Sequence, residues 1–146
     1  MLKSFLTPDH VRIVDAVADW QEAVRLSAQP LLDGGFIEAR YLAKIFEEYE
    51  KSGPYFVIAP GFAVPHARPQ DGSLKQGLSM LIVRNGVAFD SDNDLVRIVV
   101  MLAADDHTSH VKMLSSLAEM LGDAETVMSL ARATQAAEVA ELIRSF

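Results

Sequence analysis

Apolar positions in the first third of the chain recur with helical spacing. Over residues 20–32 they lie three and four positions apart, which predicts an amphipathic helix that ends at the Asp-Gly-Gly of residues 33–35. A second helix is predicted over residues 37–49, with glutamates on its outer face and a stop at the Ser-Gly-Pro that follows. A short first strand is predicted ahead of both, at residues 11–14.

The pattern then changes to short runs typical of strands. The β-prone segments are residues 55–58, 62–64, 77–83 and 95–103. The last of them is apolar enough to lie in the middle of a sheet. Asn85-Gly86 and the polar residues 91–94 predict turns between the last two strands.

Helical spacing returns at residues 108–121, where Thr108 or Ser109 is expected as the N-cap. Two shorter helices are predicted over residues 124–132 and 136–145. Helices, then strands, then helices predict an α/β fold: a mixed β-sheet of about four to five strands sandwiched by helices. With no repeat or linker, we expect a single domain over residues 1–146.

Composition narrows the classes of function. With 50% hydrophobic residues the chain is globular, and without cysteine it can form no disulfide, thiolate nucleophile or cysteine zinc site. A net charge of −7 and no basic run argue against nucleic-acid binding and favour a partner with a basic docking surface. Because no apolar run suits a signal peptide or a membrane helix, we expect a soluble, cytoplasmic protein without direct membrane insertion.

The unusual segment is residues 59–69. Pro65 restricts Val64 to an extended backbone and ends the strand, so we expect His66 at a strand edge on a stiff backbone. An imidazole near neutral pH is a nucleophile that could receive a phosphoryl group, and Arg68 places a guanidinium close in sequence. A histidine after a proline is also commonly an ordinary surface or capping residue, so the residues alone leave both interpretations open.

Two further histidines, His107 and His110, lie where a predicted strand leads into a helix. A helix N-terminus favours anions through its free N–H groups and its dipole. If His110 faces His66, the two rings and the helix end form a phosphate-sized pocket. Solvated surface histidines are one alternative. A metal site with Asp105 and Asp106 is another, although the sequence shows too few further ligands for it.

The segment GFAVPH at residues 61–66 resembles the phosphorylation-site signature of enzyme IIA (EIIA) of the mannitol/fructose type, from the sugar phosphotransferase system (PTS). A longer set of matches resembles the ascorbate-specific branch: GPY at 53–55, IAPG at 58–61, PHARP at 65–69 and DG at 71–72. SHV at 109–111 is similar to the segment with the family's second active-site histidine. The resemblance in element order covers nearly the whole chain.

The resemblance implies a phosphotransferase that needs no cofactor or metal. His66 would accept a phosphoryl group from the phosphocarrier HPr and pass it to a cognate enzyme IIB (EIIB), typically to a cysteine. A membrane enzyme IIC would act together with this EIIB. His110 would share the catalytic site, and Arg68 and Ser109 would stabilise the phosphate. The transported molecule would be an ascorbate-like carbohydrate. The oligomeric state is left open, with a homodimer as one alternative.

One departure from the family concerns the second helix, where mannitol-type members carry an arginine that helps the phosphate site. Here residues 47–50 read EEYE, so either Arg68 takes that role or backbone N–H groups and His110 act alone. The rival function is a regulatory signalling module phosphorylated on the same histidine; a single domain without a DNA-binding segment favours transport. A metal-dependent hydrolase that uses the histidines is a third, and it would purify with stoichiometric metal.

Overall fold

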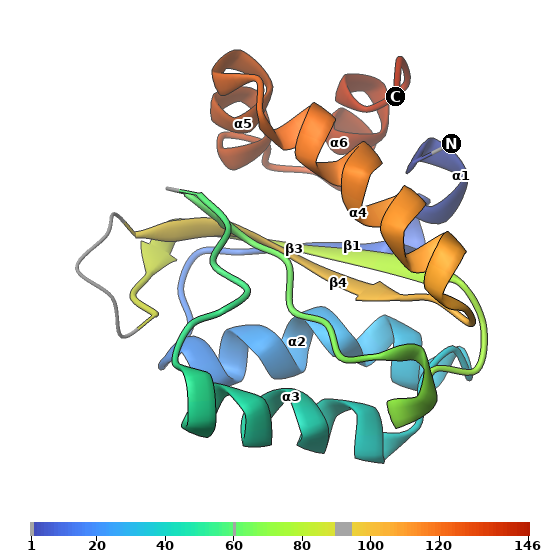
Figure 1. Cartoon of the computed structure of the whole chain (residues 1–146). Coiled ribbons are helices and arrows are strands. Elements are labelled where there is room, and N and C mark those ends of the chain that lie inside the picture. Colours follow the sequence, from blue (N-terminus) through green and yellow to red (C-terminus); the bar gives the residue numbers. More distant parts are fainter. Residues whose placement is uncertain (1, 60, 90–94) are drawn as a thin grey trace.

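The protein is an α/β structure with helices on both faces of one β-sheet (Figure 1). The computed structural model describes residues 2–59, 61–89 and 95–146. Its α-helices are α1 (Leu2–Phe5), α2 (Trp20–Asp33), α3 (Ala39–Ser52), α4 (His107–Leu121), α5 (Ala124–Ala131) and α6 (Ala136–Leu142). Its strands are β1 (Val11–Val14), β2 (Phe62–Ala63), β3 (Gly77–Val87) and β4 (Val96–Ala103), with 3-10 turns η1 (Pro8–His10) and η2 (Pro69–Asp71).

The four strands form a mixed sheet in the order β1-β3-β4-β2. The long central strands β3 and β4 run antiparallel, and each carries a short parallel strand on its outer side. The predicted fold class, a mixed sheet of about four to five strands between helices, is therefore confirmed. The short edge strand β2 lies within the GFAVPH segment, three residues before His66.

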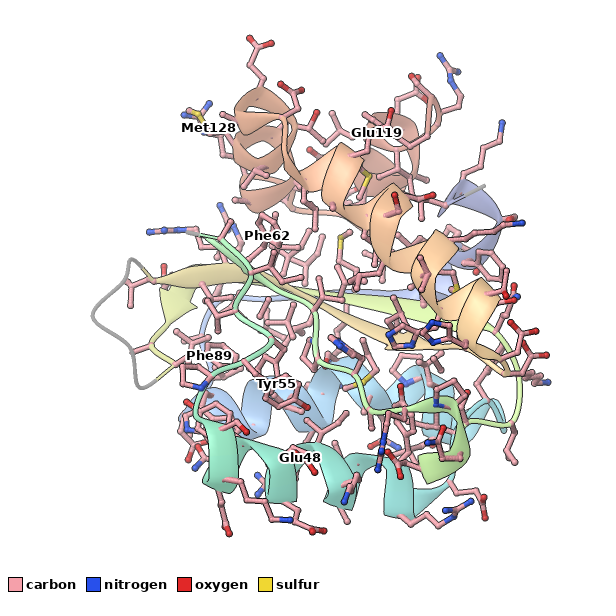
Figure 2. All side chains as sticks on the ribbon, viewed as in Figure 1. Glu48, Tyr55, Phe62, Phe89, Glu119 and Met128 are labelled. Atoms are coloured by element: carbon pink, nitrogen blue, oxygen red, sulfur yellow. The ribbon has the colours of Figure 1, made fainter. Side chains whose placement is uncertain are left out.

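Both faces of the sheet are covered, which explains why β3 and β4 are apolar without alternation. One face, with Met80 and Ile98, packs with residues of α1 and α4 to α6; the other, with Leu81 and Val99, packs with α2 and α3. Figure 2 shows Phe62 on the side of the first group of helices and Phe89 on the side of the second.

The helix predictions are confirmed with small shifts in their ends. Helix α2 begins at Trp20 as predicted, and α3 begins at Ala39 rather than at residue 37 and ends at Ser52 rather than at residue 49. Helices α5 and α6 match the two short C-terminal predictions and end earlier.

The strand predicted at residues 55–58 is wrong. These residues turn instead: the Tyr55 N–H donates to the Gly53 carbonyl and the Val57 N–H to the Pro54 carbonyl. Phe56 is fully buried, so its apolar character serves the core and not a ladder of strand hydrogen bonds.

The turn predicted at Asn85-Gly86 is also wrong, because β3 continues through it to Val87. The ladder shifts register between Ile82 and Val87, and Gly86 has φ 77°, a conformation that glycine adopts without a steric penalty. The glycine therefore allows an irregularity inside the strand. The turn predicted at residues 91–94 lies outside the described residues.

Candidate active site

His66 follows an edge strand that keeps its alignment after the regular ladder ends. Residues of β2 pair with β4, and beyond them the Val64 N–H donates to the Phe56 carbonyl at 2.9 Å. The Leu102 N–H then donates to the Pro65 carbonyl at 3.2 Å. Pro65 itself offers no N–H, so the ladder stops there and His66 stands at the end of β4.

The environment of His66 defines which of its ring nitrogens is free. Nδ1 lies 2.7 Å from the carbonyl oxygen of Val64. A carbonyl can only accept, so Nδ1 carries the proton and Nε2 keeps its lone pair. Burial lowers the pKa of His66, and the hydrogen bond to Val64 opposes that shift in part. The ring is therefore neutral at physiological pH, which is the nucleophilic form.

The structure brings His110, in the first turn of α4, next to His66. The two ring centroids are 5.1 Å apart and the planes meet at 67°. Burial lowers the pKa of His110, and the nearby His66 and His107 lower it further. Nδ1 of His110 is buried, and the described residues offer it no hydrogen-bond partner. A second imidazole with a lowered pKa thus lies edge-on beside the ring of His66.

Helix α4 begins one residue before the expected start, and its N-cap is Asp106, not Thr108 or Ser109. The Asp106 carboxylate accepts from the Ser109 N–H at 2.7 Å. The N–H and the hydroxyl of the half-buried Ser109 both interact with this carboxylate, and both lower the pKa of Asp106. His107 is exposed at the first helical position and lines a separate hollow with Arg68.

A cavity of about 330 Å³ adjoins His66. Its lining residues are Lys44, Glu48, Tyr55, His66, Ala67, Arg68 and Asp71. In Figure 2, Tyr55 lies next to α3, the helix that carries Glu48. The cavity beside His66 is thus lined by two cationic side chains, Lys44 from α3 and Arg68 from the loop after β2.

The two cations differ in exposure. The Arg68 side chain is 68% exposed, with Nε 3.5 Å from the Asp71 carboxylate, whereas the Lys44 side chain is 24% exposed. Lys44 Nζ lies 3.3 Å from the Glu48 carboxylate, and this hydrogen bond is the main reason that the pKa of Lys44 is raised. The sequence did not single out Lys44, because the arginine of mannitol-type members was expected at residues 47–50. A cation one helical turn earlier was the available signal.

Tyr55 is a second residue that the sequence did not assign to the site. Its hydroxyl donates to the His66 carbonyl at 2.8 Å, and its ring stands edge-on to the imidazole at 5.9 Å. The mistaken strand at residues 55–58 concealed this contact, because it treated Tyr55 as a ladder residue.

The arrangement of residues 2–59, 61–89 and 95–146 bears on metal binding and on membranes. In this part of the chain, no three His, Cys, Asp or Glu side chains come together in a way that could hold a metal ion. Among the same residues, no helix has the length and apolar character needed to cross a membrane.

Comparison with known proteins relates this geometry to a family. Residues 4–146 match the family model described as "Phosphoenolpyruvate-dependent sugar phosphotransferase system, EIIA 2". The mannitol-specific cryptic phosphotransferase enzyme IIA component of Escherichia coli (strain K12) is 32% identical over 142 residues, 97% of each chain. A solution structure of the E. coli protein of that description superposes with a TM-score of 0.91, at 32% identity over 99% of each chain.

Two more relatives extend the comparison. The ascorbate-specific PTS EIIA component of E. coli (strain K12) is 35% identical over 135 residues, 91% of this chain and 88% of the relative. The enzyme IIA of E. coli in a complex of mannitol IIA with phosphorylated mannitol IIB has a TM-score of 0.84 at 25% identity, covering 96% of this chain and 97% of that one. This chain therefore belongs to the EIIA type 2 family of the phosphoenolpyruvate-dependent sugar phosphotransferase system.

Proposed function

We propose that this protein is a cytoplasmic phosphocarrier whose His66 accepts a phosphoryl group at Nε2 from phospho-HPr and passes it to a cognate EIIB. One observation carries the proposal: the Val64 carbonyl holds the proton on Nδ1, 2.7 Å away, so the Nε2 lone pair is free. The nucleophile is ready without any prior proton transfer.

Each transfer exchanges one phosphorus bond for another. The Nε2 lone pair of His66 attacks the phosphorus of the phosphohistidine on HPr, and the donor P–N bond breaks with its electron pair returning to the donor ring. A thiolate of EIIB then attacks the same phosphorus, and the P–N bond to His66 breaks in turn. Such transfers depend on in-line placement and charge stabilisation, so the proposed relay requires no metal or cofactor.

Four groups around His66 are candidates to stabilise the added negative charge. We assign His110 to the catalytic pair, as donor of a hydrogen bond to a phosphoryl oxygen, on the 5.1 Å spacing of the rings. We assign Arg68 and Lys44 to the electrostatic environment, since both line the adjoining cavity. The Ser109 hydroxyl, one residue before His110, is a further candidate donor once it turns away from the Asp106 carboxylate.

A relative supports the proposed partner, and the motifs around His66 support the proposed cargo. The mannitol IIA of E. coli, with the same fold, is known in complex with phosphorylated IIB, which supports an EIIB as acceptor here. We propose an ascorbate-like carbohydrate, carried by the associated membrane enzyme IIC, because of the ascorbate-type motifs around His66. The carbohydrate does not contact EIIA in this scheme, so the site itself does not select it.

Intact-mass measurement after incubation with phosphoenolpyruvate, enzyme I and HPr tests the carrier role. We expect one acid-labile phosphoryl group on the wild type, none on His66→Ala, and an unchanged gain on the matched control His10→Ala. His10 is a suitable control because its Nδ1 also lies near a carbonyl, that of Leu78 at 2.8 Å, on another part of the sheet. No added mass with HPr demonstrably charged would overturn the proposal.

Addition of the cognate EIIB then separates transport from regulation. Loss of the phosphoryl group from His66 with its appearance on EIIB supports the relay. A phosphoprotein that no cognate EIIB discharges is instead a regulatory module.

A further inference from the structure

The backbone on either side of His66 is attached to a single residue of the central sheet. On one side, the Leu102 N–H donates to the Pro65 carbonyl at 3.2 Å. On the other side, the Ala67 N–H donates to the hydroxyl of Tyr41 at 3.1 Å, and that hydroxyl lies 2.6 Å from the Leu102 carbonyl. The Leu102 N–H therefore binds the histidine segment directly, and the Leu102 carbonyl binds it through the hydroxyl of Tyr41.

The Tyr41 hydroxyl has the partners it needs for this junction. It accepts one hydrogen bond, from Ala67, and donates its single proton to Leu102, with the Ala67 carbonyl at 3.2 Å as a second acceptor in reach. Tyr41 and Leu102 are fully buried and Ala67 is 7% exposed, so water does not replace these bonds. Burial raises the pKa of Tyr41 to about 12, which keeps the proton in place at working pH.

This junction also relates His66 to His110. Leu102 is the penultimate residue of β4, and the chain runs from there into α4, which carries His110 in its first turn. A segment fixed to Leu102 is therefore fixed relative to the start of α4. The spacing of the two rings, 5.1 Å between centroids, depends on how firmly the histidine segment is held at this point.

We propose that Tyr41 is a positioning residue for phosphoryl transfer: its buried hydroxyl fixes the His66 segment to β4 and so sets the placement of His66 against His110. The inference rests on the proposed function of His66. Tyr41 acts through the backbone of Ala67 and has no contact with the transferred group. Loss of the hydroxyl should slow the chemical step and leave recognition of the donor protein unchanged.

The test compares Tyr41→Phe with the matched control Tyr49→Phe. Both residues lie on α3 in the same core cluster and both substitutions remove one hydroxyl, but Tyr49 stacks on Trp20, with 3.8 Å between ring centroids, and has no place in the junction. We expect Tyr41→Phe to lower the single-turnover rate at saturating phospho-HPr by about 10- to 100-fold, since misplacement by about 1 Å can cost about 100-fold. The half-saturating HPr concentration should stay unchanged.

A spectroscopic measurement distinguishes positioning from mere stability. Nitrogen-15 spectra of the imidazoles should show altered ring signals for His66 and His110 in Tyr41→Phe and wild-type signals in Tyr49→Phe. Transfer rates within twofold of each other in the two folded variants, with unaltered ring signals, would overturn the proposal.

One measurement on the unmodified protein keeps the inference testable if Tyr41→Phe does not fold. The Ala67 amide should exchange its hydrogen slowly in the wild type, because its acceptor is buried. Free exchange at Ala67 would contradict the junction. If the wild type takes up no phosphoryl group, the proposed function of His66 is wrong. The hydrogen exchange at Ala67 and the ring signals of His66 and His110 are measured on the unphosphorylated protein, so they test the role of Tyr41 independently.

Discussion

Replacement of His110 by alanine tests the chemistry of the site most directly. The substitution removes the ring that faces His66 with 5.1 Å between centroids and leaves the Val64 contact of His66 in place. A phosphoryl group on Nε2 would add negative charge to His66, whose ring lies next to that of His110. The N–H of His110 is therefore expected to donate to a phosphoryl oxygen during transfer.

The size of the effect follows from one hydrogen bond to a charged group. Such bonds contribute about 1.5–3 kcal/mol. His110 is only partly buried, so water can replace part of its contribution, and the lower part of that range, about 1.5–2 kcal/mol, applies. At about 1.4 kcal/mol per factor of ten, the rate of phosphoryl transfer should fall by about 10- to 30-fold in His110→Ala.

Rapid-quench single-turnover transfer from phospho-HPr measures this rate. His107→Ala is the matched control, because His107 lies three positions earlier on α4 and is exposed; it should change the rate by less than about twofold. His110→Gln, which restores an N–H donor, should recover part of the loss. Wild-type speed in His110→Ala would refute the reasoning, as would an equal loss in His107→Ala.

Three other outcomes are expected. Lys44→Ala should slow the same transfer about three- to tenfold, and Arg68→Ala less, because solvent screens the more exposed Arg68; equal effects would contradict this. Burial lowers the pKa of His66, so the unfolded chain, with a histidine pKa of about 6.5, takes up protons first as pH falls. Stability is then full above about pH 6.5 and declines as pH falls towards the lowered pKa; urea titrations should show a smaller decline in His66→Ala. Asp106→Ala removes the acceptor of the Ser109 N–H and should cost about 1 kcal/mol, lowering Tm by about 2–4 °C, and an unchanged Tm would count against the cap.

Local signals account for what was predictable about the site. Proline restricts its neighbours whatever the rest of the chain does, so Pro65 indicated a stiff strand end at His66 without any knowledge of packing. The apolar spacing after residue 107 likewise indicated that His110 stands near a helix start. In both cases the deciding forces act within a few residues.

Other parts of the site are set by contacts between distant segments. Tyr41 reaches Leu102 across 61 positions of sequence, and nothing in the helical pattern around Tyr41 distinguishes it from an ordinary core residue. Lys44 has the appearance of a surface cation until α3 is placed beside His66. The error at residues 55–58 has the same origin, because a buried Phe56 fits a strand and a packed turn equally well.

The sequence alone determined the α/β class, the position of most helices and strands, and the segment that we propose carries the chemistry, since periodicity and proline geometry are local properties. Only the tertiary structure decided the order β1-β3-β4-β2, the continuation of β3 past Gly86 and the group of side chains around His66. These depend on which buried surfaces pack together. That choice is made by the free energy of the whole core, and no single stretch of sequence contains it.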